Sequence, residues 1–331
     1  MPFASHDGVS LRYDRAGSGP AVLLIHGWTC NRTFWQHQVT ALRDRFTVIT
    51  VDLRGHGESS RAKKGYTIPA MAGDLEMLVR TLNVPHVALV GWSMGGMIAQ
   101  ELARRLGDRV SALALVCTTP GGLADPKAPD FDQARLDGMR AAIRDDLKTF
   151  LRGLAAQFFK RGTESPLHSW AFHEIQKTPA TVVETCFESI LAADLHPHLK
   201  DIKVPTAILH GRHDALLPLA GGEELEKAIT GATLTVFENS AHAPFLEEPE
   251  AFNTALADFL THKKPTVAAK SATPPPQASS PAPKPSQPPK AAPAPTKAAP
   301  APKSTAAPRP AGRATAGRGA KPAAGKGTRK K

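Results

Sequence analysis

Ser93 stands in a pentapeptide whose residue types and spacing can make a hydroxyl group reactive. The segment Gly91-Trp92-Ser93-Met94-Gly95 follows an apolar run and precedes a stretch of helical period. In that context a Gly-x-Ser-x-Gly sequence forms a sharp strand-to-helix turn, which strains the serine and raises its hydroxyl above the sheet. The N-terminus of the following helix favours the negative charge that develops there. We therefore predict Ser93 as a nucleophile for acyl transfer, rather than as a residue of a plain structural turn.

A serine hydroxyl is a poor nucleophile at neutral pH, so it needs a general base and a carboxylate that orients the base. Where the nucleophile lies in such a turn, the chain order is serine, acid, histidine. His242 lies in the loop after the last predicted strand, and Asp214 lies just beyond the apolar run that ends at Leu209. Both follow strand C-termini, so they can converge on Ser93. The neighbouring His213 is a competing titratable group, and a turn residue is the alternative role for Asp214.

Acyl transfer also needs two N–H donors that face the oxygen on which negative charge develops. The N–H of Met94, directly after the nucleophile, is the first, and the loop after the apolar run 21–25 should supply the second. We predict the N–H of Trp28 for this role and a supporting role for His26. The segment 52–59 is dense in charge and imidazole, but it leaves a strand through glycines. We therefore expect it to stabilise neighbouring loops rather than to take part in catalysis.

The elements that would position these residues alternate along the chain. Nearly continuous apolar runs suit strands covered on both faces of a parallel sheet, and they occupy residues 21–25, 46–51, 87–90, 112–116 and 206–209, with a more mixed run at 233–237. Segments of helical period lie at 68–82, 94–106 and 249–260. This alternation predicts an α/β fold with a mostly parallel sheet flanked by helices. Residues 8–14 are expected to add an antiparallel edge strand.

Residues 119–194 interrupt the alternation with helix-rich sequence that contains no good strand. One amphipathic helix is expected over 137–160 and another over 179–191. An insertion between two sheet strands is best interpreted as a helical cap over the C-terminal edge of the sheet, where open α/β sheets bind ligands. We therefore divide the folded body into a core of 1–118 and 195–262 and a cap of 119–194 that shapes the substrate pocket.

The C-terminal segment 263–331 differs sharply in composition from the rest of the chain. It holds 15 of the 41 basic residues, 16 prolines and no acidic residue, whereas residues 1–262 carry a formal charge of −4. The overall charge of +11 is therefore a property of this tail. Such a segment cannot bury enough apolar surface to offset its chain entropy, so we expect disorder with polyproline II character. Its charge suits nonspecific contact with nucleic acid or another polyanion, and a solubilising spacer is the alternative.

No metal or cofactor pattern accompanies the candidate residues. The 13 histidines are dispersed, and no zinc, Walker or dinucleotide-type motif is present, so the predicted mechanism needs no metal and no cofactor. The three scattered cysteines fit neither a disulfide framework nor a zinc spacing. The N-terminus has no signal-peptide pattern, and no stretch approaches the roughly 18 apolar residues that span a bilayer. We expect a cytoplasmic protein without a membrane span.

Five motifs together resemble those of the α/β-hydrolase superfamily. They are H-G-W at 26–28, D-L-R-G-H-G-E-S at 52–59, G-W-S-M-G-G at 91–96, G-R-H-D at 211–214 and S-A-H-A-P-F at 240–245. The resemblance extends over residues 1–262 and implies the α/β-hydrolase fold. Dehalogenases and epoxide hydrolases of this superfamily use a carboxylate where this chain has Ser93, so those reactions are not expected.

Within the superfamily the chain is similar to pimeloyl-acyl-carrier-protein methyl ester esterases. The similarity rests on two tryptophans, the segment 193–199 and the segment 241–245. It implies an acyl pocket lined by Trp28, Trp92 and Phe150. It also implies that basic cap residues face an acidic carrier protein, the alternative being a solvated helix face; these residues are Arg144, Lys148 and Arg152. The run 91–100 equally resembles 3-oxoadipate enol-lactonases, which use the same triad on a lactone.

The sequence therefore predicts a carboxylic ester hydrolase in which Ser93, His242 and Asp214 form an acyl-enzyme and then release it to water. A pimeloyl-carrier-protein methyl ester or a similar acyl ester is the expected substrate, and a lactone is the alternative. A protein of another class, which binds polyanions through residues 263–331, is the competing interpretation.

Overall fold

The computed structural model describes residues 2–6, 8–121, 123–124 and 132–261. In this part of the chain eight strands form one sheet in the order β1-β2-β4-β3-β5-β6-β7-β8. Their bounds are β1 Phe3–His6, β2 Val9–Ala16, β3 Ala21–Ile25, β4 Thr47–Val51, β5 Val87–Trp92, β6 Val110–Val116, β7 Thr206–Gly211 and β8 Thr233–Phe237. All pairs from β4 to β8 are parallel, which confirms the mostly parallel sheet. The predictions for residues 263–331 lie outside the described residues.

The antiparallel end of the sheet differs from the prediction. Strand β2 is antiparallel to β4 as expected, but it is not the edge strand, because β1 pairs with its outer side from Phe3↔Arg12 to His6↔Val9. Gly8 precedes β2 with a φ of +76°, a conformation that glycine adopts without a steric penalty and that permits the tight reversal. The edge therefore belongs to β1, a strand of only four residues.

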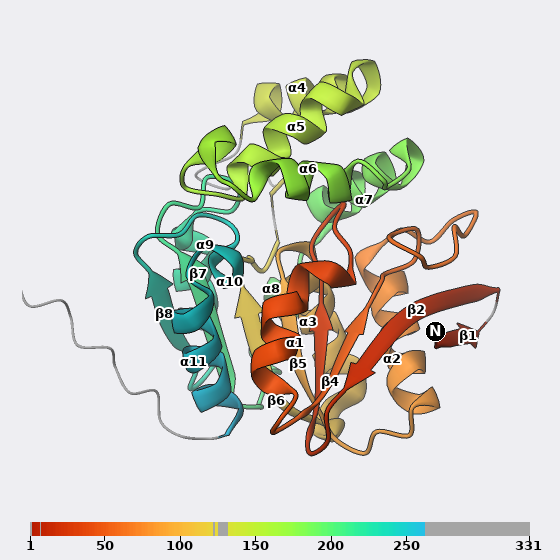
Figure 1. The fold of residues 1–331 in the computed structure, drawn as a ribbon, viewed down its shortest axis with the longest axis vertical. Coiled ribbons are helices and arrows are strands. Elements are labelled where there is room, and N and C mark those ends of the chain that lie inside the picture. The colour runs from red at the N-terminus through yellow and green to blue at the C-terminus, as the bar shows by residue number, and fades with distance from the viewer. Residues whose placement is uncertain (1, 7, 122, 125–131, 262–331) are drawn as a thin grey trace, which may run out of the picture. The chain divides into compact units, whose positions relative to one another are not determined.

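Helices cover both faces of the sheet (Figure 1). Helix α1 packs against α11, and α2 packs against α3, which also contacts β5 and β6. Helix α2 carries apolar side chains at helical spacing along the face that packs on the core, and Met71, Leu75 and Leu78 of that face are fully buried. The helices of the core and its short 3₁₀ turns are η1 Arg32–Trp35, α1 Gln36–Leu42, α2 Ile68–Thr81, α3 Met94–Leu106, η2 Gly107–Arg109, α8 His196–Leu199, α9 Leu219–Ala228, α10 Pro244–Glu247 and α11 Pro249–Leu260.

Four further helices lie between β6 and β7, above the ends of the sheet strands (Figure 1). They are α4 Gln133–Asp145, α5 Leu147–Gln157, α6 His168–Ile175 and α7 Ala180–Ala192, with the short turn η3 Gly162–Glu164 between α5 and α6. The single helix expected over 137–160 is wrong. The chain breaks at Asp146, with φ −147° and ψ 72°, and its side chain accepts a hydrogen bond from Thr149 N as the N-cap of α5. Helix α7 confirms the helix expected over 179–191, whereas α6 was not predicted.

The two connections between these helices and the core run side by side. Gly121 and Asp194 form an isolated antiparallel bridge, and Leu195 N donates to Pro120 O at 2.8 Å. A Cβ on Gly121 would lie 2.2 Å from Ala193 O, so only glycine permits this approach. Among the described helices, none has the length and apolarity that a membrane crossing requires.

Candidate active site

The backbone places Ser93 at the junction of β5 and α3 in a strained conformation. Its φ is 56° and its ψ is −121°, which a residue with a side chain rarely adopts. Neighbouring glycines permit the tight turn: a Cβ on Gly91 would lie 2.3 Å from Gly95 O, and one on Gly95 would lie 2.4 Å from Ile25 O. Ser93 N donates to Val116 O at 2.9 Å, which ties the turn to β6. The local structure is the turn that the Gly-x-Ser-x-Gly sequence predicts.

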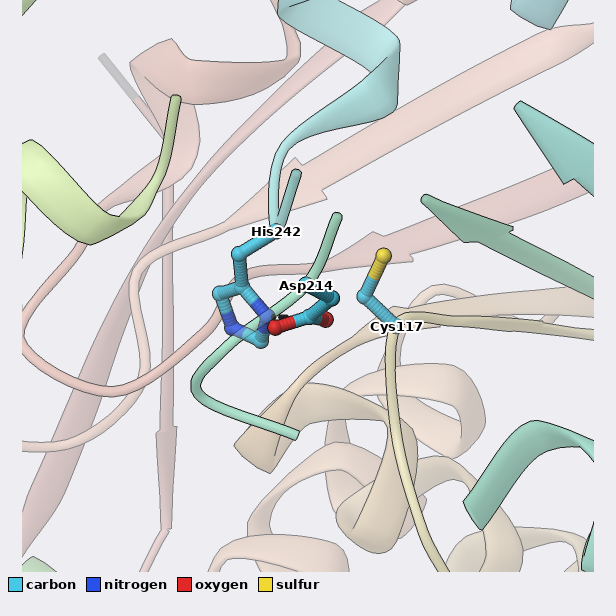
Figure 2. Close-up of side chains that lie close together, drawn as sticks. All are labelled: Cys117, Asp214 and His242. Carbon is cyan, nitrogen blue, oxygen red and sulfur yellow. Dashed lines mark hydrogen bonds and ion pairs between the residues drawn. The ribbon is translucent and has the colours of Figure 1, made fainter. Parts of the chain in front are cut away.

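Asp214 and His242 meet although 28 residues separate them. The distance between His242 Nδ1 and Asp214 Oδ2 is 2.7 Å, and Figure 2 shows the imidazole and the carboxylate side by side. The other carboxylate oxygen of Asp214 accepts hydrogen bonds from Leu216 N and Leu217 N, both at 3.0 Å. With Nδ1 donating to the carboxylate, His242 Nε2 is left as an acceptor, which is the tautomer that a general base requires.

The charge of Asp214 is stabilised by two imidazoles. Burial by itself would raise the pKa of this carboxyl, but the proximity of His242 and of His210 outweighs the burial and holds the pKa well below its usual range. His210 Nε2 lies 3.4 Å from Asp214 Oδ2 and 2.9 Å from Leu217 O. Asp214 is therefore ionised at neutral pH, which suits a residue that orients an imidazole.

Ser93 and His242 line the same cavity. Trp92, next to Ser93 in sequence, donates its indole N–H to His242 O at 2.7 Å, so the backbone of the histidine is fixed to the turn that carries the serine. Within the described part of the chain, Ser93 Oγ makes no hydrogen bond. Hydrogen bonds between a catalytic serine and its base are often long without substrate and tighten when substrate binds.

The loop after β3 lies directly beside Ser93. A Cβ on Gly27 would lie 3.3 Å from Ser93 Cβ. As far as the described residues extend, the backbone N–H groups of Trp28 and Met94 donate no hydrogen bond, so two donors are available next to Ser93. His26 supports this loop, since its Nδ1 lies 2.8 Å from Gly27 O and its Nε2 accepts from Leu53 N at 3.0 Å. Burial lowers the pKa of His26 to about 4, so its imidazole is neutral at neutral pH.

The segment 52–59 stabilises loops, as its sequence suggests. The buried Asp52 accepts hydrogen bonds from Arg32 N at 2.7 Å and from Glu58 N at 2.9 Å, and it forms an ion pair with the Arg32 guanidinium at 2.6 Å. Asp52 is not among the residues that line the cavity beside Ser93.

The cavity is lined mainly by apolar side chains from the core and from α4, α5 and α7. Trp28 and Trp92 line it, as the sequence resemblance implies. Phe150 does not: its ring centroid lies 5.9 Å from that of Trp28, outside the cavity lining. Phe158, directly after the last residue of α5, does line the cavity, although the sequence did not single it out. The centroid of its ring lies 6.0 Å from that of the His242 imidazole. Ala243 N donates to Phe158 O at 3.0 Å, a long-range contact with no local sequence signal.

Cys117 lies on the far side of Asp214 from His242 (Figure 2). One ligand atom from each of Cys117, Asp214 and His242 lies within 4.8 Å of the others, the spacing of a possible metal site among the described residues. However, Asp214 and His242 are hydrogen-bonded to each other, and burial raises the pKa of the Cys117 thiol well above its ordinary value. A neutral thiol is a poor metal ligand, so the cluster is better explained as packing around the carboxylate.

Comparison with known proteins assigns this chain to a family. Residues 20–249 match the family model described as the alpha/beta hydrolase fold. The chain belongs to this family. This α/β hydrolase is 31% identical over 257 residues to a pimeloyl-acyl-carrier-protein methyl ester esterase of Vibrio vulnificus. The aligned region covers 75% of this chain and 97% of the Vibrio vulnificus protein.

Two solved structures of similar overall fold are an esterase from Exiguobacterium antarcticum and an enol-lactonase from Burkholderia xenovorans LB400. The esterase is 29% identical to this chain, with a TM-score of 0.73, and the superposition covers 77% of this chain and 97% of the esterase chain. The enol-lactonase is 29% identical to this chain, with a TM-score of 0.71, and the superposition covers 78% of this chain and 100% of the enol-lactonase chain. This α/β hydrolase is therefore an enzyme of the esterase type.

Proposed function

We propose that the protein is a serine carboxylic ester hydrolase whose catalytic residues are Ser93, His242 and Asp214. The observation that carries the proposal is the 2.7 Å hydrogen bond between His242 Nδ1 and Asp214 Oδ2, at the wall of the cavity that Ser93 also lines. Ser93 Oγ attacks the ester carbonyl while His242 Nε2 takes its proton. The N–H groups of Trp28 and Met94 then donate to the tetrahedral oxyanion.

Collapse of the tetrahedral intermediate breaks the bond to the alcohol. His242 returns the proton to the leaving alkoxide, and the acyl group stays on Ser93 as an ester. Water then attacks this acyl-enzyme with His242 again as the base, and the carboxylic acid leaves. Asp214 keeps its charge throughout, holds the imidazole in the required tautomer and stabilises the imidazolium that forms.

An acyl ester suits the cavity because its lining is mainly apolar. We propose a medium-length acyl ester as substrate, and the relationship to the Vibrio vulnificus esterase makes a pimeloyl-carrier-protein methyl ester the first candidate. Exposed basic residues on α4 and α5 would meet the acidic carrier; they are Arg144, Lys148 and Arg152. Arg144 lies 3.2 Å from Asp145, and the Arg152 guanidinium lies over the Phe172 ring, so both are partly engaged within the chain.

A lactone is the second candidate, and the similarity to the Burkholderia xenovorans enol-lactonase supports it. The same residues would open the ring, because a lactone is an internal ester and the leaving alkoxide simply stays attached to the acyl group. The two candidates therefore differ in substrate and not in catalytic residues.

Labelling with a fluorophosphonate tests the catalytic residues. The wild-type protein should be labelled at Ser93, Ser93→Ala should not be labelled, and Asp214→Asn should be labelled slowly. Absence of labelling in folded wild-type protein would contradict the proposal. A panel of p-nitrophenyl esters of increasing acyl length, compared with pimeloyl methyl ester and an enol-lactone, then identifies the substrate class by kcat/KM.

A further inference from the structure

The loop that carries the second oxyanion donor is bound to the helical insertion as well as to the core. We define the oxyanion loop as residues 27–31. Its Trp28 indole N–H donates to Val183 O of α7 at 3.0 Å. Thr178, just before α7, donates its hydroxyl to Thr29 O at 2.8 Å. Asn31 Nδ2 donates to Glu174 Oε2 of α6 at 2.8 Å, so three residues of the oxyanion loop are hydrogen-bonded to the insertion.

The oxyanion loop has a conformation that needs such external support. Thr29 has a φ of 65°, in the left-handed region that β-branched residues avoid. Such a conformation is energetically unfavourable and persists only where the surroundings of the residue determine it. Thr29 and Thr178 are both buried, so their mutual hydrogen bond has no water to replace it. The carbonyl that Thr178 holds belongs to the peptide unit 29–30. The N–H of that same unit, Cys30 N, donates to Gly27 O at 3.2 Å, and Gly27 O lies in the peptide unit that carries the Trp28 N–H. Thr178 therefore acts on the direction of the Trp28 N–H through this turn.

Aromatic packing from the insertion holds the same tryptophan. The Trp28 ring stacks on Phe187 of α7, with centroids 5.3 Å apart and planes inclined by 19°. Phe150 of α5 approaches it at 5.9 Å, which gives Phe150 a contact with the oxyanion loop in place of a contact with the cavity. The insertion thus holds both the side chains and the backbone of the loop, and two of the helices that do so, α5 and α7, also line the cavity.

We propose that α6 and α7 position the oxyanion donor, with Thr178 as the principal positioning residue and the Asn31–Glu174 pair as a second support. The inference rests on the proposed function, because it takes the Trp28 N–H as the donor. Its consequence is that the helical insertion does more than select the substrate: displacement of α6 and α7 from the core withdraws one oxyanion donor, so the enzyme stabilises the transition state only while the insertion is seated.

Thr178→Val tests the proposal, because valine has nearly the same shape and lacks the hydroxyl. Loss of a complete oxyanion donor costs about 10²–10³ in turnover, and a misdirected donor should cost part of that. We expect kcat to fall about 5- to 50-fold with KM changed less than about twofold. Thr178→Ser, which keeps the hydroxyl, should restore kcat to near the wild-type value. Thr185→Val is the matched control, because Thr185 is exposed on α7, the helix that follows Thr178, and its hydroxyl donates to Thr181 O of the same helix at 2.7 Å.

A transition-state analogue separates positioning from general loosening of the fold. A trifluoromethyl ketone adds to the serine to give a tetrahedral oxyanion, so its inhibition constant should rise in Thr178→Val by the factor by which kcat falls. Affinity for the carboxylate product, which forms no oxyanion, should not change. If Thr178→Val fails to fold, Glu174→Ala provides the same comparison from the rim of the loop, where the Glu174 side chain is 13% exposed.

The outcomes distinguish this proposal from the proposed function. If the wild-type protein reacts with fluorophosphonate at Ser93 but Thr178→Val keeps full kcat and full affinity for the trifluoromethyl ketone, the role of the insertion is refuted and the triad stands. A parallel loss of product affinity, or an equal loss in Thr185→Val, would also overturn it. Failure of the wild-type protein to react at Ser93 would refute the function itself.

Discussion

Replacing Ser93 by glycine should abolish hydrolysis and at the same time stabilise the fold. The serine has φ 56° and ψ −121°, a backbone conformation that glycine adopts readily and that a residue with a Cβ adopts only under constraint. The turn is fixed from several sides, because Gly95 lies against the carbonyl groups of Ile25 and His26 and Ser93 N is bonded to Val116 O. The residue therefore cannot relax, and the strain persists in the folded state.

The expected gain is the difference between two terms. Relief of backbone strain should contribute about 1–3 kcal/mol to the free energy of unfolding. The greater freedom of glycine in the unfolded chain opposes this by about 0.5–1 kcal/mol. Loss of the hydroxyl costs little, since Ser93 Oγ has no hydrogen-bond partner in the described residues. The net stabilisation should lie between about 0 and 2.5 kcal/mol, with a middle value of about 1 kcal/mol. Each kcal/mol corresponds to a rise in Tm of about 2–4 °C for a domain of this size.

Urea unfolding of Ser93→Gly and Ser93→Ala measures this difference. Both variants are inactive and both lack the hydroxyl, but alanine keeps the Cβ and therefore the strain. Ser93→Gly should unfold at a higher urea concentration than Ser93→Ala, with the same dependence on urea. If glycine is no more stable than alanine, the turn is not strained in the way that its dihedral angles indicate.

Three further predictions follow from the site and its supports. Asp214→Asn should lower kcat about 10⁴-fold because the amide favours the wrong imidazole tautomer, and a loss below tenfold in a steady-state assay would argue against the triad. Gly96→Ala places a Cβ 2.6 Å from the Thr118 side chain, whose hydroxyl donates to Ser93 O at 2.8 Å. It should destabilise the fold by about 1–3 kcal/mol in urea unfolding and also lower kcat, whereas unchanged values would show that Thr118 can move freely. Burial lowers the pKa of His26 to about 4 and of His56 to about 3, so unfolding takes up protons below pH 6.5. Stability should be complete above that pH and fall by about 1.4 kcal/mol per pH unit for each histidine as pH drops towards 4. Urea midpoints between pH 7.5 and 5 check this, and an equal slope in His56→Gln would contradict it.

The core of the fold could be predicted because each of its elements carries a local signal. Central strands that are covered on both faces must be continuously apolar, and those runs correspond to β3, β4, β5, β6 and β7. Strand β8 lies at the edge of the sheet and is only partly buried, which fits its more mixed sequence. The Ser93 turn was predictable for a similar reason, since its glycines are required by backbone contacts within a few residues of the serine and with β3. Chain order then indicated which acid and which histidine to expect, and the structure places Asp214 and His242 2.7 Å apart.

The insertion was harder to predict because long-range packing determines it. Asp146 lies within a segment of helical period, and only its side-chain bond to Thr149 N reveals that one helix ends and another begins there. Which aromatic residue of this segment meets the cavity depends on how α5 packs against the core. The sequence alone therefore does not distinguish Phe150 from Phe158 as a cavity residue. In the structure the Phe158 ring lies beside His242 and the Phe150 ring beside Trp28. Strand β1 was missed because four residues give too short a pattern to distinguish a strand from a loop.

This division has a consequence for how the substrate range of the enzyme can change. The serine and the acid are supported by strands and by glycine-dependent backbone contacts in the core. The insertion reaches the histidine loop through a backbone hydrogen bond, from Ala243 N to Phe158 O, so side-chain substitutions elsewhere in α4 and α5 should leave all three residues in place. The Trp28 donor differs, because Thr178, Glu174 and Val183 O hold its loop from the insertion itself. Residues of α4 and α5 that face the cavity can therefore vary with the acyl group, whereas α6 and the start of α7 can vary only in ways that keep their three hydrogen bonds to the oxyanion loop. Substrate preference should accordingly be easier to alter from α4 and α5 than from α6 and α7, where the same change also lowers kcat.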